Sequence, residues 1–257
     1  MNAAVQKRRK REFQGGAKHR AQSREEKDQP VLTPRCRAEK ISIRRLQLAE
    51  LPADTVQLAR FLIGKVVVHD LAAGRLSGRI VETEAYPPGD PAGHHYRGPT
   101  RRNRSLFLRH GHCYVYFTYG NHFMLNVSSE GADVGGGVLI RALEPLDGVA
   151  TMQRHRKTTR LLDLTRGPGR LAAALRIDRR YDGLDLCGSG PLWLGAIDSS
   201  LVQPAAPIGT TVRIGITRAV HCLYRFFERD NPFVSGPKRL LSGNRQEVKG
   251  ASADRED

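Results

Sequence analysis

Residues 79–86 have the sequence RIVETEAY, in which side chains of two kinds alternate from Val81 onward. A period of two is typical of a β-strand, whose successive side chains point to opposite faces. The period places Glu82, Glu84 and Tyr86 together on one face. Taken alone, two carboxylates on one face are more typical of a solvent-facing strand at a sheet edge than of a site.

Segments on both sides of this stretch have similar patterns. They predict a helix capped by Asp54 and ended by Gly64, strands over 65–69, 78–86, 113–118, 122–128 and 137–143, and a helix over 170–175 after the loop Gly167-Pro168-Gly169. Strands grouped in the middle with helices at the flanks favour an α+β fold over a parallel βαβ array. We expect a single mixed domain with a central, mostly antiparallel curved sheet, a protruding β-hairpin and flanking helices.

The charge of the chain indicates a polyanionic partner. Its 257 residues include 42 Lys or Arg and 26 Asp or Glu, a formal net charge of +16. Clustered basic residues gain affinity for phosphates by displacing counterions. Charge alone does not distinguish DNA from RNA or from an anionic membrane.

The distribution of charge and apolar residues predicts three regions. The first 45 residues hold 14 Lys or Arg and 5 Asp or Glu, and apolar periodicity extends only from Leu46 to Ser235. We therefore expect a basic disordered tail at 1–45, a folded domain at 46–235 and a polar tail at 236–257. The first tail also resembles a localisation signal or a non-specific DNA-binding arm.

Cysteine spacing and apolar content narrow the class of protein. Cys36, Cys113, Cys187 and Cys222 lack the paired short spacing of zinc or iron–sulfur sites, so neither a metal nor another cofactor is expected. No run of about 18 apolar residues could span a bilayer, and the N-terminus lacks a secretory signal. We expect a soluble intracellular protein without a membrane partner.

Two later segments carry groups suited to nucleic acids. His94 and His95 precede the run RRNR at 101–104, which is suited to phosphate contacts or else forms a solvated basic loop. In YVYFTYG at 114–120, Tyr119 falls at the turn of the predicted hairpin. An exposed ring there is costly unless something covers it, and an unstacked base step is a natural cover.

Seven motifs follow one another along the chain: VETEAY at 81–86, DPAGH at 90–94, YVYFTYG at 114–120, LNV at 125–127, LIRALEPL at 139–146, RGPGRL at 166–171 and RIGI at 213–216. In this order they resemble the alkyladenine (3-methyladenine) DNA glycosylase family. The resemblance covers about residues 46–235 and is more specific than any one motif. Two departures are Arg102, where the family usually has proline, and Gly135-Gly136-Gly137, which suggests a slightly longer turn before the strand of Arg141.

The resemblance implies roles for individual residues. Glu84 matches the general base that activates the attacking water, whereas Glu82 takes no such role. The residues matched to the pocket of the flipped base are Tyr86, His94, Tyr116, Arg141 and Asn126, the last a discriminator against normal guanine. Tyr119 matches the wedge that fills the gap in the duplex. Alignment through Asp-Pro-Ala favours His94 as the pocket histidine, while counting from Tyr86 in some relatives favours His95.

The activity that the resemblance implies is base-excision repair. Such an enzyme flips alkylated or deaminated purines out of double-stranded DNA and hydrolyses the N-glycosidic bond, leaving an abasic site. Cleavage builds positive charge on the sugar, which a carboxylate stabilises while it orients water. A cationic alkylated purine also stacks well on tyrosine faces. The implied lesions are 3-methyladenine, 7-methylguanine, hypoxanthine and ethenoadenine.

Several further expectations accompany this activity. No lysine belongs to the motif set, so simple hydrolysis without a lyase step is expected. The protein is expected to act as a monomer, in a bacterial cytoplasm and nucleoid or in a eukaryotic nucleus. Contacts with the DNA backbone are expected from Arg101 and Arg104, and from Gly169 and Arg170, where free amides at a helix start can hold a phosphate. A plain loop entering a helix is an equal alternative at Gly169.

Three rival interpretations fit part of the sequence. A non-enzymatic RNA-binding or ribosome-associated protein fits the charge and the tyrosines but does not explain Glu84. A relative that acts on another nucleobase or on RNA is the second. The third is an inactive homologue that serves as a lesion scaffold, against which the intact set of Glu84, Tyr86 and Tyr119 argues.

Overall fold

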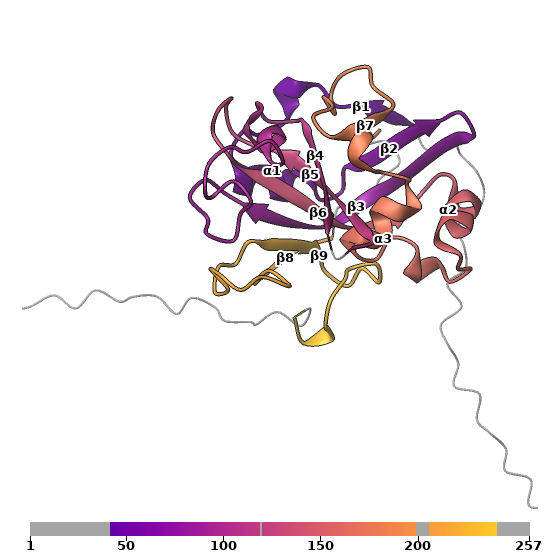
Figure 1. The fold of residues 1–257 in the computed structure, drawn as a ribbon. Coiled ribbons are helices and arrows are strands. Elements are labelled where there is room, and N and C mark those ends of the chain that lie inside the picture. The colour runs from indigo at the N-terminus through magenta and orange to yellow at the C-terminus, as the bar shows by residue number, and fades with distance from the viewer. Residues whose placement is uncertain (1–41, 119, 199–205, 241–257) are drawn as a thin grey trace, which may run out of the picture. The chain divides into compact units, whose positions relative to one another are not determined.

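In the part of the chain that the structure describes, an antiparallel sheet of nine strands forms the centre of the fold (Figure 1). The computed structural model describes residues 42–118, 120–198 and 206–240, which belong to the unit formed by residues 40–257. The main path of the sheet is β1-β7-β2-β3-β6-β5-β4, and β9 pairs with β3 and β8. The strands are β1 Ile43–Arg45, β2 Val66–Leu71, β3 Gly74–Tyr86, β4 Cys113–Thr118, β5 His122–Ser128, β6 Gly137–Pro145, β7 Leu192–Ile197, β8 Ile208–Thr211 and β9 Arg225–Glu228.

Strand β3 has 13 residues and pairs with three other strands. Strand β2 pairs with its first half and β9 with its second half, while β6 pairs along the other edge. Both edges of β3 are thus paired, and every residue from Ile80 to Ala85 is buried. Glu82 and Glu84 therefore lie in the interior, and the interpretation of this segment as a solvent-facing edge strand is wrong.

The pairing of β3 with β6 contains two compensating irregularities. The register shifts between Ile80 and Glu82 and shifts back between Glu82 and Thr83. As a result, Val81 on β3 and Arg141 on β6 have no Cα partner across this pair. Such irregularities change the direction of a side chain and are common next to active sites.

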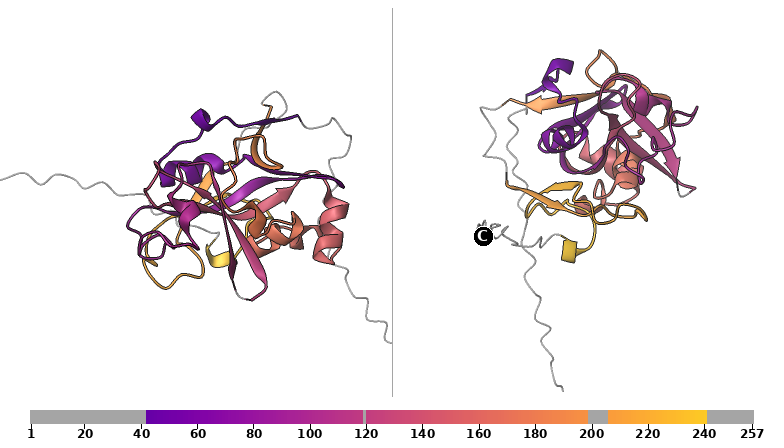
Figure 2. Two further views of the ribbon diagram at one scale, coloured as in Figure 1. Left: turned by 45° about the horizontal axis from the view of Figure 1, so that its top comes forward. Right: turned by 90° about the vertical axis from the view of Figure 1, so that its left-hand side faces the viewer.

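Three α-helices lie within the described ranges: α1 Thr55–Leu62, α2 Val149–Arg156 and α3 Pro168–Ala174. The carboxylate of Asp54 caps α1 by accepting a hydrogen bond from the backbone N–H of Gln57 at 2.8 Å. Helix α1 contacts β3 and β6, and α3 contacts β5 and β6 (Figure 2). Their apolar faces join one core cluster with the sheet. The short 3₁₀ helices are η1 Leu48–Glu50, η2 Arg104–Phe107, η3 Leu161–Asp163, η4 Arg179–Tyr181 and η6 Lys238–Leu240.

The α+β class and the mostly antiparallel curved sheet are confirmed, as are the predicted helices and strands. The sequence patterns missed β1, β7, β8, β9 and α2. All four residues of β9 are buried, so the strand has no alternation that would reveal it. Helix α2 buries only Met152 and therefore has no apolar stripe. None of the helices in the described ranges is long and apolar enough to cross a membrane.

Strands β4 and β5 form the expected antiparallel pair, from Cys113 opposite Val127 to Thr118 opposite His122. The predicted tip, Tyr119, lies outside the described residues, so a protruding hairpin stays a prediction. The limits of the folded domain and the disorder of the tails stay predictions as well. Strand β1 lies just before the predicted start of the domain and pairs with β7.

Replacing Leu58 with alanine should lower the free energy of unfolding by about 2–5 kcal/mol, because this fully buried side chain of α1 would leave a cavity. The measurement is urea denaturation followed by circular dichroism. Gln57→Ala changes an exposed position of the same helix and should stay within about 0.5 kcal/mol. Equal losses in the two variants would show that α1 does not belong to the cooperative core.

Candidate active site

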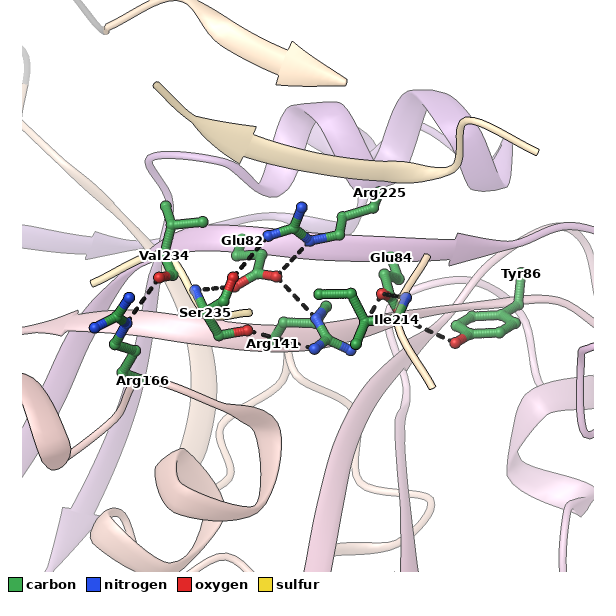
Figure 3. A network of polar contacts seen from close by, with 9 residues as sticks. All are labelled: Glu82, Glu84, Tyr86, Arg141, Arg166, Ile214, Arg225, Val234 and Ser235. Carbon is green, nitrogen blue, oxygen red and sulfur yellow. Dashed lines mark hydrogen bonds and ion pairs between the residues drawn. The ribbon is translucent and has the colours of Figure 1, made fainter. Parts of the chain in front are cut away.

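Glu84 is a fully buried carboxylate with a partner for each oxygen (Figure 3). Its Oε1 accepts a hydrogen bond from the backbone N–H of Ile214 at 2.8 Å and lies 3.1 Å from Nη1 of Arg141. Its Oε2 accepts a hydrogen bond from the Tyr86 hydroxyl at 2.9 Å. Groups from β3, from β6 and from the segment after β8 thus hold one carboxylate.

The surroundings of Glu84 act on its pKa in opposite directions. Burial raises the pKa of the Glu84 carboxyl above its ordinary value, and the neighbouring Glu82 adds to this effect. The Arg141 guanidinium opposes it most strongly, followed by the hydrogen bonds from Ile214 and Tyr86. A carboxylate with a raised pKa is a better proton acceptor at neutral pH, provided that it remains ionised.

Glu82 lies next to Glu84 but has different partners. Its Oε1 accepts hydrogen bonds from Nε of Arg141 at 2.9 Å and from Nε of Arg225 at 2.7 Å. Its Oε2 accepts a hydrogen bond from the backbone N–H of Ser235 at 2.6 Å. Two carboxylates and two guanidiniums therefore form one buried cluster with no net formal charge (Figure 3).

A cavity of about 590 Å³ lies beside this cluster. Tyr86, Arg141 and Ile214, which all contact Glu84, line the cavity. His94, Tyr116 and Asn126 line it as well, so the structure brings all five residues of the predicted base pocket to one cavity: Tyr86, His94, Tyr116, Asn126 and Arg141. Glu84 lies directly behind its lining.

Two tyrosines and a histidine form one wall of the cavity. The rings of Tyr114 and Tyr116 stack with their centroids 5.4 Å apart. The ring of His94 meets Tyr116 edge-on at 4.4 Å, and its Nδ1 lies 3.0 Å from the Tyr114 hydroxyl oxygen. Burial lowers the pKa of His94 and raises that of Tyr114, so both are neutral near pH 7.

His95 also lines the cavity but is held in a different way. Its Nε2 donates a hydrogen bond to the carbonyl oxygen of Pro87 at 2.9 Å. A Cβ atom added at Gly93 or Gly135 would come within 3 Å of His95. Gly93 and Gly135 thus permit close packing around this histidine.

Asn126 lies on β5 at the cavity wall and is buried. Its Nδ2 donates to the backbone carbonyl oxygen of Tyr114 at 3.1 Å and, more weakly, to that of Met124 at 3.4 Å. These hydrogen bonds fix the plane of the amide. A rigid polar group at this position can limit which edges of a base fit beside it.

Arg101 and Arg104 lie together with two further arginines. They line a hollow of about 460 Å³ with Arg102, Arg179 and Asp182, which we call the arginine hollow. Arg102 and Arg179 each donate a hydrogen bond to a backbone carbonyl oxygen of β4, at 3.1 and 2.6 Å. Strand β4 is the last on the main path of the sheet, so the two arginines cover its free edge.

Gly169 and Arg170 lie apart from the arginine hollow, on α3. Gly169 is buried, and a Cβ atom there would come within 3 Å of the His122 ring. Arg170 is exposed and forms an ion pair with Asp163 at 3.0 Å. The glycine therefore permits close packing of the helix against β5.

The residue patterns did not reveal a buried ion pair between Arg213 and Asp90. Nη1 of Arg213 donates to the Asp90 carboxylate and to the carbonyl oxygen of Ala85, the latter at 3.0 Å. The guanidinium carbon lies 4.6 Å from the centre of the Tyr86 ring. The sequence feature that could have revealed this ion pair is the position of Arg213 between Val212 and Ile214. A charged residue in an apolar run indicates a buried partner of opposite charge. Nor did those patterns assign roles to Arg225 or Ser235.

Metal ligands were not expected from the cysteine spacing. Within the residues that the structure describes, no group of three or more His, Cys, Asp or Glu side chains is arranged to hold a metal ion. Cys113, Cys187 and Cys222 are free thiols. The expectation of a reaction without metal or cofactor stays a prediction.

Asp90→Asn should lower the free energy of unfolding by about 3–5 kcal/mol, because it leaves the buried Arg213 charge without a counter-charge. Urea denaturation measures this loss. The double variant Asp90→Asn/Arg213→Met should lose less than the sum of the two single changes, because no unpaired charge remains. Strictly additive losses would mean that the pair is not coupled.

Comparisons with known proteins agree with the motifs. The sequence model of the methylpurine-DNA glycosylase family matches residues 49–232. A candidate 3-methyladenine DNA glycosylase of Mesorhizobium japonicum is 63% identical over 192 residues, which cover 75% of this chain and 90% of that protein. A second, of Paraburkholderia phytofirmans, is 52% identical over 192 residues, or 75% and 88% of the two chains. The chain therefore belongs to the methylpurine-DNA glycosylase family and is a DNA repair glycosylase for alkylated bases.

Proposed function

We propose that this protein flips damaged purines out of double-stranded DNA into the cavity beside Glu84 and hydrolyses the N-glycosidic bond, leaving an abasic site. The observation that carries the proposal is the position of Glu84, a buried carboxylate held by three residues that all line one cavity. The cavity volume, about 590 Å³, lies in the range of about 300–1,000 Å³ usual for small-molecule sites.

The chemistry follows from the charge that develops. The bond that breaks joins C1′ of the sugar to a ring nitrogen of the purine, and the bond that forms joins C1′ to a water oxygen. Glu84 accepts a proton from that water, and its negative charge stabilises the positive charge on the sugar. An alkylated purine is already cationic, so it takes the bonding electrons and leaves neutral. A neutral deaminated purine has to take up a proton from solvent to leave as a neutral base.

The attacking water has to reach one oxygen of Glu84. Oε1 already has two donors, Ile214 and Arg141, whereas Oε2 has only the Tyr86 hydroxyl. Ile214 donates a backbone N–H, and Arg141 is held by Glu82 as well. The Tyr86 hydroxyl is the partner that can move, because its ring lines the cavity and would contact an incoming base. We infer that the attacking water takes its place at Oε2.

The cavity wall is suited to a cationic purine. Tyr86, Tyr116 and the neutral His94 supply ring faces and edges without a positive charge. We assign His94 rather than His95 to the base, because His94 contacts Tyr116 while Nε2 of His95 is occupied by a backbone carbonyl. Asn126 would exclude normal guanine.

The wider function is proposed from the resemblance and the charge. The lesions would be 3-methyladenine, 7-methylguanine, hypoxanthine and ethenoadenine. Tyr119, between β4 and β5, would fill the gap that the flipped base leaves in the duplex. The protein would act as a monomer wherever the cell keeps its DNA, and the basic residues of 1–45 would add non-specific attraction to DNA.

Glu84→Gln should lower the rate of base release by about 10²–10⁴-fold while DNA binding is retained, because the general base is lost. Single-turnover release from duplexes with ethenoadenine or hypoxanthine, and from methylated DNA, measures this. Glu228→Gln is a matched control, since Glu228 is a buried glutamate of the same sheet that pairs with Arg79 at 2.7 Å. An unchanged rate in Glu84→Gln would contradict the proposal. Binding without release in the wild type would favour a scaffold or an RNA-binding protein.

The arginine hollow offers a place for the DNA backbone. A third hollow, of about 290 Å³, shares Arg102 with it and shares His94, Tyr114 and Arg218 with the base cavity. The three hollows thus form a row from the base cavity to Arg101 and Arg104. We propose that phosphates of the damaged strand follow this row. Pro168 also lines the base cavity, so contacts by Gly169 and Arg170 would fall on its rim.

Arg101→Gln/Arg104→Gln should weaken binding to undamaged duplex and reduce the slope of log affinity against log salt by about 2, near 0.9 for each lost phosphate contact. Fluorescence anisotropy at several salt concentrations measures the slope. Arg160→Gln/Arg176→Gln removes the same charge from two exposed arginines outside the row. If both double variants have the same slope, the arginine hollow acts only through net charge.

A further inference from the structure

The buried charge cluster contains more groups than the reaction uses. Glu84 and Arg141 take part in the proposed mechanism, whereas Glu82 and Arg225 do not. Each of the four side chains is at least nine-tenths buried. Burying an ion pair seldom stabilises a fold more than a well-packed apolar pair would. A role for Glu82 and Arg225 other than stability is therefore worth deriving from their contacts.

Arg141 is the link between the two carboxylates. Its Nε donates to Oε1 of Glu82 at 2.9 Å, and its Nη1 lies 3.1 Å from Oε1 of Glu84. Because the guanidinium is planar and rigid, fixing Nε also fixes the direction of Nη1. Arg141 stands at a register shift, where no Cα partner fixes its direction. The hydrogen bond to Glu82 therefore fixes the direction of the Arg141 side chain, which the strand pairing leaves open.

Glu82 is itself held from the side opposite Arg141. Arg225 on β9 donates from Nε to Glu82 at 2.7 Å and from Nη2 to the carbonyl oxygen of Ser235 at 2.8 Å. The backbone N–H of Ser235 donates to the other oxygen of Glu82. The Glu82 carboxylate cannot rotate without breaking its hydrogen bonds to Arg225 and Ser235, so it is a fixed anchor for Arg141.

We propose that Glu82 and Arg225 are positioning residues that aim the Arg141 guanidinium at Glu84 and so keep the catalytic carboxylate ready to accept a proton. The inference rests on the role of Glu84 in the proposed function. The charged and titratable groups that face Glu84 are Glu82 and Tyr86 from β3 and Arg141 from β6, while Arg213 faces Tyr86 and Arg225 acts through Glu82.

Charge changes at the two positioning residues should move the pKa of Glu84 in opposite directions. Glu82→Gln removes a negative charge beside Glu84 and leaves the cluster positive, so the pKa of Glu84 falls. Arg225→Gln leaves Glu82 undercompensated and draws Arg141 toward it, so the pKa of Glu84 rises. Glu82→Gln/Arg225→Gln restores neutrality and should give an intermediate value. If Glu82 and Arg225 had a purely structural role, the variants would have a lower free energy of unfolding, but the pKa of Glu84 would not follow this order.

The test is the pH dependence of single-turnover base release by the full chain, since release falls as Glu84 becomes protonated. We expect the acidic limb to move to lower pH by about one unit in Glu82→Gln and to higher pH by about one unit in Arg225→Gln. The double variant should lie between them. Affinity for the lesion duplex should stay at the wild-type value in all three. Arg225→Lys keeps the charge and should keep the limb near that of the wild type.

Controls separate this inference from the proposed function. Glu228→Gln removes a buried carboxylate paired with Arg79 and should leave the acidic limb unmoved. If Arg225→Gln does not fold, Glu82→Gln and Arg225→Lys still decide the question. If the acidic limbs of the pH profiles coincide in all variants, as expected if His94 or His95 sets the limb, the inference is overturned. The proposed function still holds in that case, provided that Glu84→Gln loses base release. Full release by Glu84→Gln would overturn both.

Discussion

The guanidinium of Arg141 joins two carboxylates at the centre of the sheet, and much of the fold serves to bury this contact. Isolated buried charges are costly, so the cluster has to be neutral and hydrogen-bonded. Strand β3 meets that need because it has partners along both edges: β6 supplies Arg141, and β9 supplies Arg225. At the register shift, strand pairing does not fix the direction of the Arg141 side chain. The anchored carboxylate of Glu82 fixes it instead.

The segment that follows β8 couples this cluster to the cavity wall. The backbone N–H of Ile214 holds Glu84, while the preceding Arg213 holds Asp90 and lies against the ring of Tyr86. Asp90 lies in the loop that follows β3 and carries His94 to the cavity. Two adjacent residues therefore connect the Glu84 carboxylate to the residues that would receive the base.

How much the sequence predicted depends on the range of the interactions. The alternation around Glu84 predicted the strand and the shared face, and Asp54 and Gly64 marked both ends of α1, because these signals are local. The burial of Glu84 was not predictable from alternation, which is the same in a strand that faces solvent. Arg225 contacts Glu82 across 143 residues, and no local pattern reveals such a partner. The order of the motifs, and not their periodicity, indicated the family and the residues of the predicted base pocket.

The distribution of charge resolves an apparent conflict in the function. A chain with net charge +16 should attract phosphates yet repel a cationic base. The structure separates the two effects in space. Arg141 and Arg213 beside the cavity are balanced by buried carboxylates, and the His94 imidazole is neutral. Arg218, which also lines the cavity, is exposed, so solvent screens its charge. Exposed arginines gather instead in the row that ends at the arginine hollow, where the DNA backbone would lie. The same excess of arginine can therefore bind the polyanion without raising the free energy of a positively charged purine inside the cavity.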